Sequence, residues 1–127
     1  MTISSDVCPE VREYERTSTA VANAYVQPLM GGYLGRLKAR LAELGASAPM
    51  HLMTSGGTLT GVDTAARFPI RLVESGPAGG AILAAQLAAE RGEDQDLSFD
   101  MVGTNAKICL IEDGDPLKAR SFEVDRS

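Results

Sequence analysis

The chain is poor in the residues on which many protein functions depend. Its 127 residues include no tryptophan, one histidine and two cysteines, and aromatic residues make up 5% of the sequence. His51 stands alone, so it cannot form a metal site without other ligands. Secreted domains of this size carry denser disulfide frameworks, so Cys8 and Cys109 indicate a reducing compartment. We therefore expect a cytoplasmic protein with a largely aliphatic core.

Positive charge is also scarce. The chain has 12 Lys and Arg against 17 Asp and Glu, a formal net charge of −5. A nucleic-acid surface needs clustered Lys and Arg to replace counterions, so this class of partner is not expected. No apolar run approaches the roughly 20 residues that span a bilayer, and residues 1–7 do not resemble a signal peptide. The acidic clusters at 90–96 and 112–115 are expected to be solvated turns.

A long helical pattern occupies residues 17–44. The hydroxyl residues at 17–19 are candidate N-caps, and Gly45 is a natural stop. Pro28 and the pair Gly31-Gly32 interrupt the pattern, so a kink or break is expected there. Apolar residues at steps of three and four predict one stripe, formed by Val21, Ala24, Tyr25, Leu29, Met30, Leu34, Leu37, Leu41 and Leu44.

The middle of the chain alternates short elements with turns. We expect strands at His51–Thr54 and Ile70–Val73, a turn at Ser55–Gly57 and a short helix at Val62–Arg67. The sequence Ser75-Gly76-Pro77 predicts a helix start, because proline suits the first helical position. An alanine-rich helix over residues 78–90 follows, and Gly92 ends it.

The last third predicts a β-meander over residues 97–124. Its expected strands are Leu97–Met101, Lys107–Glu112 and Leu117–Val124, with a turn at Glu112–Asp115. A meander with uncovered faces is poorly buried. We therefore expect that sequence is missing downstream, and that the isolated chain exposes an apolar face and self-associates.

Three segments have features of an anion site. Asp100, Gly103 and Thr104 combine a carboxylate for magnesium, a glycine that lets backbone N–H groups approach an oxyanion, and a hydroxyl donor. Ser55, Gly56 and Gly57 could wrap an anion with their backbone. Ser75 and Gly76 lie at a helix N-terminus with its positive dipole end. The alternatives remain open at this stage: a plain hairpin turn, an ordinary loop and an unoccupied helix end.

Four motifs in the same order resemble the hydantoinase A/oxoprolinase family. They are the run VCPEVREYERTSTAVANAYVQPLMGGYLGRL with its Asn-Ala-Tyr-Val helix, then HLMTSGGTLT, ESGPAGGAILAA and FDMVGTNAKICLIEDG. The last resembles the family's Phe-Asp-Met-Gly-Gly-Thr-Ser-Thr-Asp followed by a strand and a Glu-Asp-Gly turn. Together the motifs span Val7 to Gly114, nearly the whole chain. The resemblance is to N-methylhydantoinase A-like subunits and related acetone and acetophenone carboxylase subunits.

The resemblance implies an α/β fragment of an actin/hexokinase-like ATPase with an RNase H-like fold. Residues 1–96 would correspond to the end of the first half of the ATPase core, and residues 97–127 to the opening β-meander of the second. The parent activity would be ATP-dependent hydrolysis of a cyclic amide of the hydantoin or 5-oxoproline class, with ATP and magnesium as cofactors. Expected partners are the remainder of the A-type subunit or a hydantoinase B-type subunit.

Departures from the family pattern fall in the phosphate turn. Val102 stands where the family has glycine, and Asn105-Ala106-Lys107 stands where it has Ser-Thr-Asp. Valine resists a positive φ and crowds a phosphate, and Lys107 cannot hold magnesium. We therefore expect no ATP or magnesium bound by this chain alone and no activity alone. The alternatives are a split-gene assembly module, or a non-catalytic small α/β domain that binds another subunit.

Overall fold

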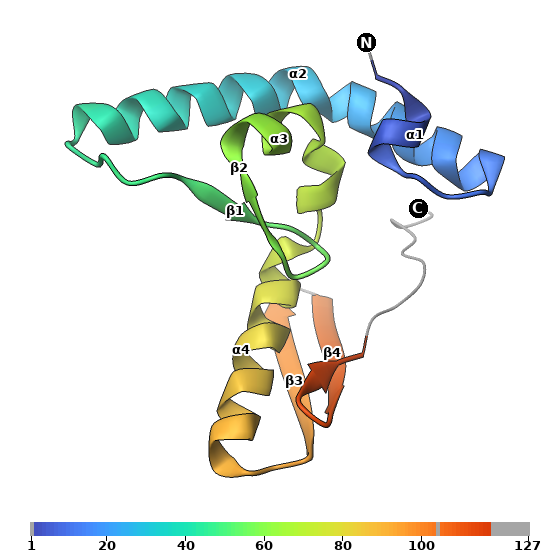
Figure 1. Cartoon of the computed structure of the whole chain (residues 1–127), viewed down its shortest axis with the longest axis vertical. Coiled ribbons are helices and arrows are strands. Elements are labelled where there is room, and N and C mark those ends of the chain that lie inside the picture. Colours follow the sequence, from blue (N-terminus) through green and yellow to red (C-terminus); the bar gives the residue numbers. More distant parts are fainter. Residues whose placement is uncertain (1, 104, 118–127) are drawn as a thin grey trace. The chain divides into compact units, whose positions relative to one another are not determined.

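The computed structural model describes residues 2–103 and 105–117. It confirms the α/β class, with helices and two small antiparallel sheets (Figure 1). The chain forms two compact units, Met1–Ser75 and Gly76–Ser127, and each is described by itself.

The first unit is built around one long helix. Its elements are α1 (Ser4–Val7), α2 (Glu13–Glu43), β1 (His51–Met53), β2 (Leu59–Gly61), α3 (Val62–Arg67) and the 3₁₀ helix η1 (Pro69–Leu72). Strands β1 and β2 form an antiparallel hairpin, with His51 opposite Gly61 and Met53 opposite Leu59. The predicted strand at 51–54, turn at 55–57 and helix at 62–67 are confirmed, whereas β2 was not predicted.

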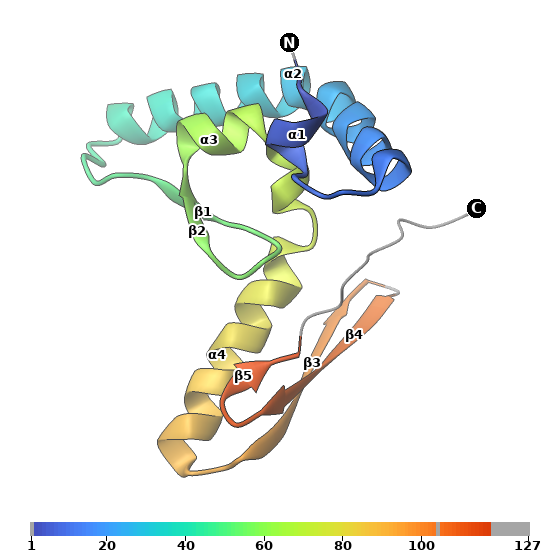
Figure 2. The ribbon, with the colours of Figure 1, turned by 45° about the vertical axis from the view of Figure 1, so that its right-hand side comes forward.

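Helix α2 begins four residues earlier than its hydroxyl residues predicted. Its N-cap is Arg12, and the Thr19 hydroxyl, inside the helix, donates to the Glu15 carbonyl oxygen at 2.8 Å. Such back-bonding to residue i−4 satisfies a threonine inside a helix, so the capping prediction was wrong. Pro28 does not break α2, which continues to Glu43. Figure 2 shows a bend between the blue N-terminal turns and the cyan remainder, consistent with the lost proline donor.

The predicted stop at Gly45 is confirmed by its hydrogen bonds. Gly45 has φ +84°, its N–H donates to the Ala42 carbonyl at 3.0 Å, and the Ala46 N–H donates to the Leu41 carbonyl at 3.0 Å. This is the Schellman arrangement, which uses the free carbonyls of the last turn. A side chain would strain the backbone at this positive φ.

A buried amide sets the rotation of α2 about its axis. Asn23 is 0% exposed, its Nδ2 donates to the Arg67 carbonyl at 3.0 Å, and its Oδ1 accepts the Ile70 N–H at 3.2 Å. The buried positions of α2 are therefore Ala20, Asn23 and Leu34. The predicted stripe was wrong in its first half, because Val21, Tyr25 and Leu29 are exposed.

Residues 69–72 form a 3₁₀ turn rather than the predicted strand Ile70–Val73. Pro69 is at the start of this turn, and the N–H groups of Arg71 and Val73 donate to carbonyls three residues earlier. The Ile70 N–H is occupied by Asn23, so it cannot join a strand ladder. An apolar run of four residues could not by itself distinguish these outcomes.

The second unit pairs one helix with a meander. It contains α4 (Ser75–Arg91), β3 (Gln95–Val102), β4 (Asn105–Glu112) and β5 (Asp115–Pro116), with β4 between β3 and β5. Helix α4 begins at Ser75, two residues before Pro77, and Gly92 with φ +71° follows its end as predicted. The meander is confirmed over its first two strands. The predicted strand Leu117–Val124 lies almost wholly outside the described residues.

The two faces of the β3–β4 ladder differ in burial. Figures 1 and 2 show α4 alongside this ladder, and its buried residues are the small Ala81, Ala85 and Ala88. Ile111, opposite Asp96, is 1% exposed. The face opposite Ile111 carries five large apolar residues that are 51–67% exposed: Leu97, Phe99, Met101, Ile108 and Leu110. The predicted exposed apolar face is therefore present in this unit.

The Asn23 amide should be essential to the first unit. We expect Asn23→Ala to lower the free energy of unfolding by about 2–4 kcal/mol, because it leaves one buried N–H and one buried C=O unpaired. Ser18→Ala, at an exposed position of the same helix, should change it by less than about 0.5 kcal/mol. All three tyrosines lie in α2 and the chain has no tryptophan, so tyrosine fluorescence during urea unfolding reports on this unit. Equal midpoints for the two variants would contradict the role of Asn23.

Candidate functional site

The Ser55–Gly57 segment is a closed turn within the first unit. The Ser55 N–H donates to the Arg71 carbonyl at 2.8 Å, and the Gly57 N–H donates to the Thr54 carbonyl at 3.0 Å. The Thr58 N–H donates to Thr54 Oγ1 at 3.2 Å, and the two threonine hydroxyls lie 2.9 Å apart. Among the described hydrogen bonds of this turn, the Gly56 N–H has no acceptor. The turn therefore offers an anion one backbone donor and the exposed Ser55 hydroxyl.

Arg71 links this turn to the N-terminal segment. Its Nη2 donates to the carbonyls of Asp6 at 2.8 Å and Val7 at 3.0 Å, while its own carbonyl accepts the Ser55 N–H. Sequence reasoning did not single out Arg71, because the residue lies in a segment that was expected to be a strand. The only sequence signal was a cation in an otherwise apolar stretch.

The Asp100–Thr104 segment lies in the second unit, at the β3–β4 turn. Asp100 is half-buried in β3, and Gly103 is exposed with φ +62°. Glycine adopts this conformation without strain, as the motif requires. Val102 is the last residue of β3, so the left-handed position falls on Gly103 and not on the valine. Thr104 lies outside the described residues.

A cation faces the candidate magnesium ligand. Asp100 and Lys107 are direct partners across β3 and β4, so both point to the same face of the ladder, and both are half-buried. Opposite charges at such positions attract each other. Magnesium binding needs oxygen ligands and not an ammonium group. The position opposite Asp100 therefore supplies no second ligand.

Ser75 and Gly76 begin α4 as expected, directly after Glu74 with φ +64°. They fall on either side of the boundary between the two units. The candidate residues are thus distributed over the chain: Ser55, Gly56, Gly57 and Ser75 belong to the first unit, and Gly76, Asp100 and Gly103 to the second. The Ser55–Gly57 turn lies within the first unit, and Asp100 and Gly103 lie within the second.

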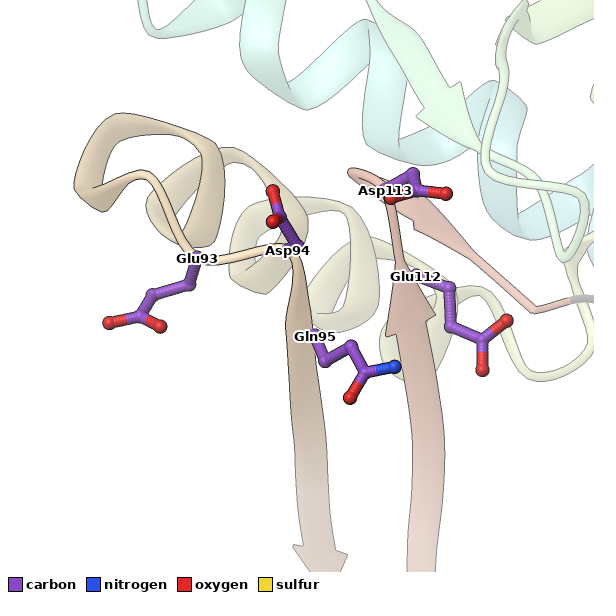
Figure 3. Close-up of a pocket in the computed structure, with 5 residues that line it drawn as sticks. All are labelled: Glu93, Asp94, Gln95, Glu112 and Asp113. Carbon is purple, nitrogen blue, oxygen red and sulfur yellow. The ribbon is translucent and has the colours of Figure 1, made fainter.

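An acidic pocket lies at the opposite end of the β3–β4 ladder from Gly103. Its lining residues are Glu93, Asp94, Gln95, Glu112 and Asp113. The two predicted acidic turns thus meet here, joined by the Asp113 N–H donating to the Asp94 carbonyl at 2.9 Å. Figure 3 shows the side chains pointing in different directions, and all five residues are exposed. Within residues 2–103 and 105–117, no group of His, Cys, Asp and Glu has a metal-binding arrangement.

Two further features bear on the expectations from sequence. Cys8 and Cys109 are both free thiols. In the part of the chain that the structure describes, no helix is long and apolar enough to cross a membrane.

Comparison with known proteins identifies the family. The hydantoinase/oxoprolinase family matches residues 16–127. An uncharacterized protein of Methanocaldococcus jannaschii is 38% identical over 121 residues, covering 95% of this chain and 18% of that protein. The caprolactamase subunit alpha of Pseudomonas jessenii is 39% identical over 86% of this chain and 16% of its own length. The 5-oxoprolinase of Saccharomyces cerevisiae is 28% identical over 90% of this chain and 9% of its own length.

The chain therefore spans less than a fifth of the length of these relatives. No solved structure matches it. The match over residues 16–127 includes most of the motifs that carried the resemblance, from the α2 helix to the Glu-Asp-Gly turn. On this evidence the chain belongs to the hydantoinase/oxoprolinase family.

Proposed function

We propose that this chain is part of an ATP-dependent cyclic amide hydrolase and works only when further polypeptide completes it. The observation that carries the proposal is the family match across residues 16–127, combined with coverage of 9–18% of the relatives. Caprolactam and 5-oxoproline, which appear in the names of two relatives, are both lactams. A lactam amide is therefore the proposed bond. Opening it consumes one water molecule, and the coupled conversion of ATP to ADP and phosphate consumes a second.

The proposed cofactors are ATP and magnesium, in an actin/hexokinase-like fold that the complete protein would form. Asp100 would hold magnesium directly or through water, and the Gly103 backbone with the Thr104 hydroxyl would approach a phosphate. Phosphoryl-transfer sites act by surrounding the phosphates with donors and metal. The Ser55–Gly57 turn contributes little to such a shell. The N–H groups of Ser55, Gly57 and Thr58 already donate to acceptors within the first unit.

The partner would be the remainder of an A-type subunit or a B-type subunit. Two relatives, the caprolactamase subunit alpha and an acetophenone carboxylase gamma subunit, are named as subunits, which fits a multi-chain enzyme. Large apolar residues on both units are uncovered, and this favours assembly over an independent small domain. A split-gene assembly module is the second candidate function. A location in the cytoplasm stays a prediction.

The isolated chain should bind no nucleotide. We expect isothermal titration with magnesium-ATP to give no saturable heat up to about 1 mM, because contacts on one open turn are weak in water. The variant carrying V102G, N105S, A106T and K107D restores the family turn and is the matched control. This variant should also give no saturable heat, because the other donors around the phosphates are not supplied. Micromolar binding, or ATP hydrolysis, by the unaltered chain would refute the proposed dependence on further polypeptide.

Lys107 should determine whether the turn attracts magnesium. We expect Lys107→Asp to create weak millimolar magnesium binding, because two carboxylates would then lie opposite each other on β3 and β4. The readout is the amide NMR shift of residues 99–108 during a magnesium titration. Lys38→Asp, the same charge change at an exposed position of α2, should leave these signals unmoved. Comparable shifts in the unaltered chain would show that Lys107 does not block the site.

A further inference from the structure

One uncovered surface of the second unit has a defined shape. We name it the apolar strip: Leu97, Phe99 and Met101 of β3 with Ile108 and Leu110 of β4. Leu97 lies opposite Leu110 and Phe99 lies opposite Ile108, so these side chains form cross-strand pairs on one face. Each is at least half exposed, while α4 lies against the other face. The apolar strip is therefore a sheet face without a covering layer among the described residues.

The dimensions of the apolar strip fit a single helix. The apolar strip spans five residues of β3, from Leu97 to Met101, and three of β4, from Ile108 to Leu110. It is therefore about 16 Å long and about 10 Å across with its side chains. A helix is about 10 Å in diameter, and about 11 residues at 1.5 Å each cover that length.

A second copy of this chain does not account for the uncovered surfaces. On α4, Leu83 and Leu87 are 57% and 44% exposed on the side away from its buried alanines. On α2, Tyr25 and Leu29 are also exposed, at 86% and 72%. A twofold pair buries one surface patch against itself and leaves the others open. The relatives have more than five times as much polypeptide, enough to cover all of them.

We infer that the apolar strip is the docking site for an amphipathic helix from polypeptide outside this segment of the family's subunit. This inference rests on the proposed function, since it names the surface through which the missing polypeptide attaches. The strip ends at the acidic pocket, which is lined by Glu93, Asp94, Glu112 and Asp113. The docking helix should therefore place its N-terminus or basic side chains at that end, because both attract carboxylates.

Co-expression tests the docking. The full chain is produced with the two flanking parts of the Methanocaldococcus jannaschii relative, whose matched segment is omitted. We expect a stable complex, which Phe99→Asp combined with Ile108→Asp weakens on the order of tenfold or more, because buried charges would then lack partners. Val11→Asp is the matched control, because Val11 is 96% exposed and lies in the other unit. It should leave the affinity unchanged.

The outcomes separate the two proposals. A complex that forms but tolerates both strip substitutions overturns the docking inference and leaves the proposed function standing. Flanking parts that assemble with the relative's own segment but not with this chain overturn both. A second measurement uses the chain alone: the double strip variant should bind a hydrophobic fluorescent dye at most half as strongly as the Val11→Asp variant. Equal dye binding would show that the strip is not an accessible apolar surface, and would also overturn the inference.

Discussion

The second unit depends on one constraint, which is that a sheet face with large apolar side chains needs a covering layer. Helix α4, whose buried residues are Ala81, Ala85 and Ala88, lies along the other face, which carries Asp100, Lys107 and Ile111. The face that carries Phe99 and Ile108 has no such layer among the described residues, so these side chains remain half exposed or more. The candidate residues on β3 and at its turn, Asp100 and Gly103, therefore belong to a ladder that is covered on one face only.

The first unit satisfies its polar groups internally. Asn23 joins α2 to the corner formed by α3 and η1, and the Arg71 carbonyl next to that corner accepts the Ser55 N–H. The same hydrogen bonds that fix the Ser55–Gly57 turn also use the donors an anion would need. This turn is therefore better suited to holding its own shape than to binding phosphate, whereas Gly103 lies on an open turn whose carboxylate faces a lysine.

The sequence predicted the elements whose structure depends on neighbouring residues alone. Such cases are the helix ends at Gly45 and Gly92, the helix start at Ser75-Gly76-Pro77 and the two long strands of the meander. Long-range contacts were not readable. The rotation of α2 depends on Asn23 bonding residues 44 and 47 positions away, and the same contact removes Ile70 from any strand. For the candidate site, the sequence singled out Asp100 and Gly103, but only the strand register shows that Lys107 lies opposite Asp100.

Hydrogen exchange of the isolated chain tests most directly whether the second unit needs polypeptide from outside. Amides of β3 and β4 should exchange about a hundredfold or more faster than the Ile70 amide, which bonds to the buried Asn23, because a half-covered ladder opens at low cost. If the amides of Ser98 and Cys109, a directly opposed pair of the ladder, are protected as strongly as that of Ile70, the unit is stable by itself, and the claim that this segment is completed by further family polypeptide is contradicted.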